Sequence, residues 1–322
     1  MEVFKTGVVD DKPDIRNYLY EEKVGGGEPF DWGKGYDVED EISERIGKPT
    51  KLKTESQNGS LSCVGQGWSK YSEVLNVFDE GVLRDFSAKD VYSHIFLPGG
   101  CATVGDGAKW IVEHGIEEEV NVPSYMGGKA PTEEFMEQVV ARNEERARKF
   151  RALSYLTTTH NDIDFLAMII RDNHGMVSSY IGSNSGWTSK ILLPPKTQDF
   201  GHCTYFGKAK LINGVKRIAL KNSGGDRIGE NGWQWMGADY FGYLKNIWTL
   251  RDLITNQENM IVDQAKLEQI YQEMLIGSAA DDPGAKEHLG KTEDEVRKAV
   301  GQSDERQRII ACINAARSVL KR

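Results

Sequence analysis

Cys63 is the residue whose type and setting best suit nucleophilic chemistry. It follows the polar loop Gln57-Asn58-Gly59-Ser60-Leu61-Ser62 and opens a run whose apolar residues recur at helical spacing. At a helix N-terminus, unpaired amides and the helix dipole stabilise a thiolate over a thiol. Gln57 lies six residues upstream (63 − 57 = 6), so its amide can neighbour the sulfur. The pattern indicates an activated thiol with a hydrogen-bond donor beside it.

A thiol nucleophile also needs a base and a group that orients the base. Of the six histidines, only His202 follows a loop glycine and begins a strand-like run. Asn222 ends the return strand of a hairpin, and hairpins bring such positions side by side. Asn222 could then bond one imidazole nitrogen and leave the other for the sulfur. The alternative interpretation is a buried core histidine and a turn asparagine.

Three segments, in order, resemble the papain-like cysteine peptidases. Residues 57–63 are similar to the family's Q-G-x-x-G-S-C loop, and Gly201-His202 to its strand-opening histidine. Residues 220–225 and 229–233 resemble the stretch K-N-S-W-G…W-G-E-x-G-Y. Residues 108–116 are similar to the helix behind the substrate cleft. The resemblance covers residues 50–250.

The resemblance implies a thiol-dependent peptidase that acts on protein or peptide substrates, with no cofactor and no metal. Cys63 would be a thiolate held against protonated His202, which then gives its proton to the leaving amine. Asn222 would orient the imidazole, and the Gln57 side chain with the Cys63 amide would form the oxyanion hole. One wall of the substrate cleft would be formed by Gly105, Asp106 and Gly107.

The sequence departs from the family pattern at three positions. Val64 and Gly224 stand where the family usually has aromatic residues, and Trp233 or Trp235 could fill the space left at Gly224. Ser60 replaces a cysteine that forms a disulfide in secreted members. We also expect the protein to lack the family's long inhibitory propeptide.

These departures leave other functions open. A papain-like fold that cleaves weakly or not at all could serve as a binding or structural component of an assembly. The same Cys–His pair could also carry another acyl transfer, of the transglutaminase or amide-forming kind. The spacing of Gln57 and the presence of Asn222 favour the peptidase.

The order of elements predicts an α+β fold of two lobes, in which a helical lobe faces an antiparallel, barrel-like sheet lobe. The Asn213-Gly214 pair is a strong hairpin signal. Helices are expected after Cys63 to residue 80 and over residues 88–98, 109–114, 132–149 and 162–172. Strands are expected over residues 151–158, 175–181, 202–206, 209–212, 215–220 and 232–236.

Three regions are predicted along the chain. Residues 1–49 form an N-terminal extension packed on the body, with a propeptide that blocks the cleft as the alternative. Residues 50–252 form the peptidase domain. Residues 256–322 have Tyr271 as their one Phe, Trp or Tyr residue and are predicted to form a small helical module that could dock a protein partner.

Composition narrows the classes of function. The 322 residues are 39% hydrophobic and 28% charged, with a net charge of −9 and no long basic stripe, which argues against nucleic acid as a partner. We find no signal-peptide core and no membrane-spanning run. The four cysteines are scattered, which suits a reducing compartment. We expect a cytoplasmic or virion-associated protein of a bacterium or phage.

Overall fold

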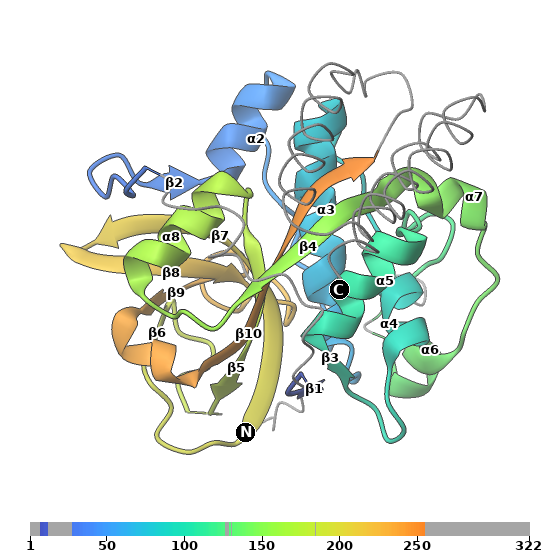
Figure 1. Ribbon diagram of the computed structural model, residues 1–322. Helices are drawn as coiled ribbons and strands as arrows, with labels where there is room; N and C mark the ends of the chain where they lie inside the picture. Colours follow the sequence, from blue (N-terminus) through green and yellow to red (C-terminus); the bar gives the residue numbers. More distant parts are fainter. Residues whose placement is uncertain (1–6, 12–27, 126–128, 130, 184, 255–322) are drawn as a thin grey trace, which may run out of the picture. The chain divides into compact units, whose positions relative to one another are not determined.

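The fold places helices beside a large twisted sheet (Figure 1). The computed structural model describes residues 7–11, 28–125, 129, 131–183 and 185–254. The helices on one side are α3 (Cys63–Glu80), α4 (Ala88–Ile95), α5 (Val104–His114), α6 (Glu133–Glu137) and α7 (Glu144–Ala147). The sheet side carries α2 (Val38–Ile46) and α8 (Ile163–Asp172), and two 3₁₀ turns lie at η1 (Arg148–Phe150) and η2 (Ala238–Tyr243). This is the α+β arrangement that the sequence predicts.

The main sheet has eight strands among the described residues. Seven follow the order β4-β10-β5-β7-β8-β9-β6, and β2 pairs with β7. All pairings are antiparallel except that of β6 with β9. The strands are β2 (Tyr36–Asp37), β4 (Arg151–Thr158), β5 (Met176–Gly182), β6 (Ile191–Leu192), β7 (Phe200–Ile212), β8 (Val215–Lys221), β9 (Trp233–Gly237) and β10 (Leu244–Ile254).

Helix α3 is the centre of the packing. All of its residues from Cys63 to Val77 are buried, so it is enclosed on every face. The Trp68 indole donates to the carbonyl of Val104 over 3.0 Å, and the Tyr71 hydroxyl donates to the carbonyl of Asn173 over 2.7 Å. The helix is therefore tied to α5 on one side and to the loop before β5 on the other.

The described N-terminal segments contact both the helical side and the sheet side of the fold. A two-residue strand, β1 (Val8–Val9), pairs in parallel with β3 (Ala102–Thr103). Asp37 caps α2 by accepting from the amide of Glu39, and α2 then packs on α3. The predicted helical module at residues 256–322 lies outside the described residues. Among the described helices, none is long and apolar enough to cross a membrane.

The hairpin prediction is confirmed, and the strands around it are longer than expected. Asn213 and Gly214 both have positive φ, 53° and 74°, as a type I′ turn requires. The two strands expected at residues 202–206 and 209–212 are one strand, β7, with a register shift between Phe206 and Lys208. A bulge interrupts the alternation of side chains without ending the strand.

Three further expectations need correction. The single exposed helix predicted over residues 132–149 is two short helices, because Arg142 turns inward to reach Asp90 and the carbonyl of His114. Helix α5 starts earlier than predicted, with Thr103 as its N-cap. Strand β10 was not predicted, since a bulge at Asn246, which has a φ of 48°, breaks its alternation.

Gly107 tests how tightly α5 packs on α3. A Cβ at this position would lie 2.2 Å from Cδ1 of Trp68, a buried and rigid ring. We expect Gly107→Ala to lower the free energy of unfolding by about 1–3 kcal/mol, as overpacking does. Chemical denaturation measures this. Gly242→Ala is the matched control, because nothing lies within 4 Å of its added Cβ, and it should stay within about 0.5 kcal/mol.

Candidate active site

Cys63 begins α3, where the sequence predicts it, and its thiol is fully buried. The backbone amides of Gly7, Cys203 and Val64 lie close enough to lower its pKa, but burial outweighs them and raises the pKa to about 12. The Cys203 amide is the link to the base, because Cys203 follows His202 directly in β7. The thiol therefore lies beside the backbone that carries the imidazole.

His202 lies near the start of β7 in an aromatic enclosure. The rings of Trp187 and Tyr180 face its imidazole edge-on, at centroid distances of 5.4 and 5.6 Å. Burial lowers the pKa of His202 to about 4, and the nearby Asn222 side chain opposes that shift. Neither imidazole nitrogen has a partner of full hydrogen-bond geometry among the described residues. At neutral pH this covered site therefore holds a thiol and a neutral imidazole.

The side chain of Asn222 is oriented by a residue that the sequence analysis missed. Asn222 donates through Nδ2 to Oε1 of Gln234 over 2.7 Å. Gln234 in turn donates to the carbonyls of Trp187 (2.6 Å) and Ser189 (2.8 Å). These hydrogen bonds leave Oδ1 of Asn222 as the acceptor available to an imidazole N–H. The only signal in the sequence is a glutamine between two tryptophans within the predicted strand 232–236.

Gln57 is joined to the Asn222 loop through Ser223. The backbone N–H of Gln57 donates to the Ser223 carbonyl over 2.8 Å, and its side-chain Oε1 accepts from the Ser223 hydroxyl over 2.5 Å. Its Nε2 donates to the carbonyl of Ser60 over 3.2 Å. A carboxamide has two N–H bonds, so the second remains for another acceptor. The loop before Cys63 and the loop after β8 are thus fixed to each other.

The space beside Asn222 is filled differently from what the sequence analysis expected. A Cβ on Gly224 would lie 2.2 Å from Cδ1 of Ile228, so Ile228 occupies the place of a side chain at 224. Trp187 adds the aromatic contact with His202. Trp233 instead lies beneath Lys208, whose Nζ is 4.3 Å from the ring centre. The side chains of Ile228 and Trp187 therefore cover the space beside Asn222 and His202.

Residues 7–11, here called the strap, run past the buried thiol. The Gly7 carbonyl accepts from the amide of Ala102 over 3.1 Å, and a Cβ on Gly7 would lie 2.4 Å from the Cβ of Leu61. A Cβ on Gly201 would lie 3.0 Å from Cγ1 of Val8, so the strap also touches the start of β7. The strap thus contacts the segments immediately before Cys63 and before His202.

The three residues predicted to line the substrate cleft have different surroundings. The amide of Gly105 donates to Asp11 of the strap over 2.9 Å, and Asp106 is half-buried. Gly107 faces Trp68 within the core. The strap itself pairs with β3, immediately before α5. As a lining of the substrate cleft, the stretch 105–107 remains a prediction.

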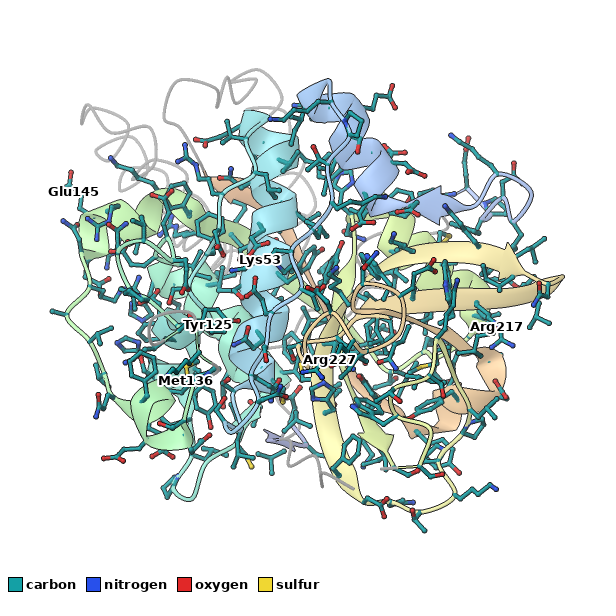
Figure 2. All side chains as sticks on the ribbon, turned by 180° about the vertical axis from the view of Figure 1, so that it is seen from behind. Lys53, Tyr125, Met136, Glu145, Arg217 and Arg227 are labelled. Atoms are coloured by element: carbon teal, nitrogen blue, oxygen red, sulfur yellow. The ribbon has the colours of Figure 1, made fainter. Side chains whose placement is uncertain are left out.

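Three carboxylates beside α3 come close enough to share a cation, those of Glu55, Glu73 and Asp85. The Nζ of Lys70 already lies 2.5 Å from Glu73 and 3.3 Å from Glu55. Lys53 bridges Glu55 and Asp85 at 3.3 Å each, and its Nζ is 5.2 Å from the ring centre of Tyr125 (Figure 2). Two ammonium groups therefore already lie among these three carboxylates, in the place where a cation would bind.

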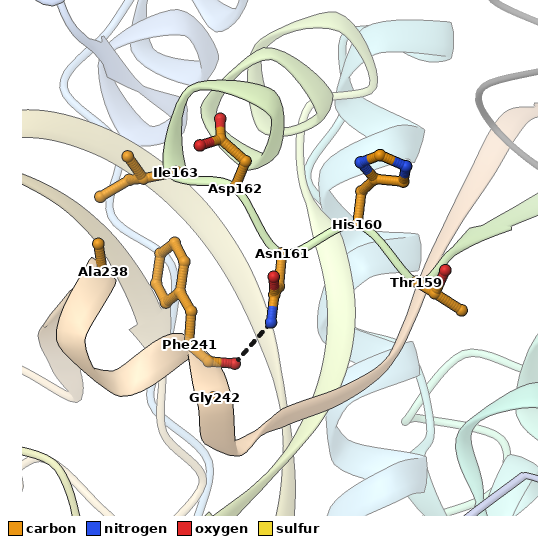
Figure 3. A pocket seen from close by; sticks show the side chains of 8 residues that line it. All are labelled: Thr159, His160, Asn161, Asp162, Ile163, Ala238, Phe241 and Gly242. Atoms are coloured by element: carbon orange, nitrogen blue, oxygen red, sulfur yellow. Dashed lines mark hydrogen bonds between the residues drawn. The ribbon is translucent and has the colours of Figure 1, made fainter.

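A polar pocket of about 550 Å³ lies elsewhere in the fold, between the loop before α8 and η2. Figure 3 shows its walls, which are tied together by a 3.1 Å hydrogen bond from Asn161 to the carbonyl of Phe241. It includes none of the residues that the sequence analysis assigned to catalysis. Its lining residues are Thr159, His160, Asn161, Asp162, Ile163, Ala238, Phe241 and Gly242.

Comparisons with known proteins identify the fold. No family model matches the chain, and no curated protein matches it. Among solved structures, xylellain, a cysteine protease from Xylella fastidiosa, aligns with a TM-score of 0.62 at 18% identity, over 78% of this chain and 97% of that one. Digestive procathepsin L2 from Tenebrio molitor aligns with a TM-score of 0.62 at 15% identity, over 77% and 78%. Bromelain from Ananas comosus, in complex with the inhibitor E64, aligns with a TM-score of 0.53 at 17% identity, over 68% and 98%.

The chain therefore has the papain-like fold, as a divergent example of it. At these identities the likeness fixes the architecture, with its helical lobe and its sheet lobe. The described geometry brings the four predicted residues into one region. Cys63 lies against the amide of Cys203, next to His202, and His202 lies near the Asn222 side chain. Gln57 accepts from Ser223, next to Asn222.

The strap should control the reactivity of Cys63. Gly7→Val places atoms where Leu61 already lies, so it should push the strap away, expose the thiol and lower its raised pKa. Each unit of that fall raises the thiolate fraction about tenfold. We expect iodoacetamide to alkylate Cys63 at least about tenfold faster at pH 7 in this variant, measured by mass spectrometry.

Val9→Thr is the control on the same strap, since the Val9 side chain is 41% exposed. It should leave the rate unchanged. In the unmodified chain the alkylation rate should keep rising with pH beyond pH 9, because the raised pKa delays thiolate formation. Equal rates for Gly7→Val and the unmodified chain would show that the strap does not protect Cys63.

Proposed function

We propose that the protein is a thiol-dependent peptidase that cleaves peptide bonds through an acyl-enzyme on Cys63. The observation that carries this proposal is the position of the thiol. Cys63 is the first residue of a buried helix and lies against the amide of Cys203, next to His202. Asn222, held by Gln234, supplies an acceptor for the imidazole. The papain-like fold supports the same class of chemistry.

The active state requires the strap to leave. Burial now disfavours both charged forms, since it raises the pKa of Cys63 and lowers that of His202. Once water and substrate replace the strap, the thiol transfers its proton to the imidazole, and the two opposite charges then stabilise each other.

The reaction then follows from the groups present. The Cys63 thiolate attacks the carbonyl carbon of the peptide, and the oxyanion accepts from the Cys63 amide and the free N–H of Gln57. The His202 imidazolium protonates the leaving amine, which leaves a thioester. Water, deprotonated by His202, attacks the thioester and releases the acid.

A binding or structural role is the second candidate. It is favoured by the neutral, fully buried pair of Cys63 and His202, which is the opposite of an active ion pair. In this role the strap would stay in place and the fold would serve recognition. Labelling of the thiol separates the two candidates.

In the Gly7→Val chain, in which the strap is displaced, an epoxide of the E-64 type should label Cys63, and adding Cys63→Ala should abolish both labelling and peptide cleavage. Intact-mass analysis and a fluorogenic peptide assay measure the two effects. Cys101→Ser is the matched control, because Cys101 is a second free thiol and is half-buried. A folded chain that stays unlabelled even with Gly7→Val would exclude the peptidase.

Gln234 should act as a positioning residue. Gln234→Met keeps the length of the side chain but removes the acceptor for Asn222, so the base loses its orientation. We expect kcat to fall by part of the roughly 10²–10⁴-fold that general acid–base catalysis supplies, with KM unchanged. Gln66→Met is the control, since Gln66 is an equally buried glutamine on α3. If both variants lose stability but keep kcat, Gln234 has only a structural role.

A further inference from the structure

The carboxylate of Asp11 in the strap is held by a set of donors. Its Oδ1 accepts from the amide of Gly105 over 2.9 Å, in the first turn of α5. Its Oδ2 accepts from the indole Nε1 of Trp248 over 2.6 Å. The hydroxyl of Thr103 adds a third donor. The donors come from β3, α5 and β10, so distant parts of the chain converge on one side chain.

The site is preformed by packing. Trp248 is only 2% exposed, and a Cβ on Gly105 would lie 2.7 Å from its Cζ2. The ring is thus packed against the first turn of α5, and its N–H donates to the carboxylate. Without Asp11, this buried indole donor would lose the acceptor that it has among the described residues. Leaving a buried donor unpaired is unfavourable, so the site favours an acceptor at all times.

The donors suit a carboxylate better than an amide. Each oxygen of Asp11 faces a different N–H donor, and a carboxylate offers only acceptors. An asparagine in the same pose would turn its NH₂ group toward one of these donors. Burial and the charge of Asp106 raise the pKa of Asp11, and the three donors oppose that rise. The helix N-terminus adds its favourable partial charge.

Asp10, the residue before Asp11 in the strap, pairs with a positively charged side chain. Asp10 pairs with Nζ of Lys245 over 2.9 Å, and Nδ2 of Asn246 lies 3.5 Å from its other oxygen. Lys245 is partly exposed, so this pair is weaker than the buried one. Two consecutive acidic residues are therefore accommodated, one within the fold and one at its surface.

We propose that Gly105, Thr103 and Trp248 form a carboxylate-binding subsite that selects peptides with an acidic side chain. The strap occupies it now, with Gly7 beside the Cys63 thiol and Asp11 four residues further on (11 − 7 = 4). A peptide that replaces the strap places its own acidic residue there. The inference rests on the proposed function only in treating this peptide as substrate.

The test uses protection of Cys63 from iodoacetamide in the full chain, which needs no catalysis. Asp11→Asn weakens the tethered ligand, so alkylation at pH 7 should become about tenfold faster, as expected for loss of a charge-assisted hydrogen bond. The peptide Gly-Val-Val-Asp-Asp, added to this variant, should restore protection. Gly-Val-Val-Asp-Asn should require about a tenfold higher concentration.

Trp248→Phe should remove the difference between the two peptides. Trp32→Phe is the matched control, because the Trp32 indole also donates to a carboxylate, that of Asp164, and it should keep the difference. The peptide comparison needs no core substitution, so it decides the matter even if Trp248→Phe does not fold. Equal protection by both peptides, or an unchanged alkylation rate in Asp11→Asn, would overturn the proposal.

Epoxide labelling of Cys63 in the Gly7→Val chain is measured in parallel. A preference for the Asp peptide without labelling leaves the subsite standing and rejects the peptidase. Labelling without a preference rejects the subsite alone.

Discussion

The complete burial of helix α3 is the constraint on which the rest of the structure depends. Because no face of this helix meets solvent from Cys63 to Val77, both parts of the fold must close around it. The first residue of the helix is then fixed where the loop before α3, strand β7 and the strap meet. The same enclosure that positions the thiol also removes its water, which makes its charged form costly.

This burial extends to charged groups along α3. Lys70 and Glu73 lie one helical turn apart, and Glu55 approaches the same ammonium group. Such a cluster is costly to bury, and its parts compensate each other only when all are in place. The backbone carbonyl of Glu55 also accepts from the amide of Gly225 over 2.9 Å, so the segment that carries Glu55 is joined to the Asn222 loop. The segment around Glu55 therefore holds both helix α3 and the loop that carries Asn222.

The electrostatics of the site describe a resting state. Burial disfavours both the Cys63 thiolate and the His202 imidazolium, because a charge in the covered site loses its hydration. The strap replaces water with backbone amides and apolar side chains, and Asp11 holds its far end at α5 and β10. The strap therefore shares the enclosure of the site with Trp187 and Tyr180, which face His202.

The sequence by itself determined the order of the elements, the position of Cys63 at a helix start and the hairpin at Asn213-Gly214, because these depend on local spacing and backbone preference. It also selected His202 and Asn222, through their places on successive strands. The tertiary structure alone decided that Gln234 orients Asn222, that Ile228 and Trp187 fill the space at Gly224, and that the strap lies beside the thiol. Those contacts join residues far apart in the chain, and no local pattern encodes them.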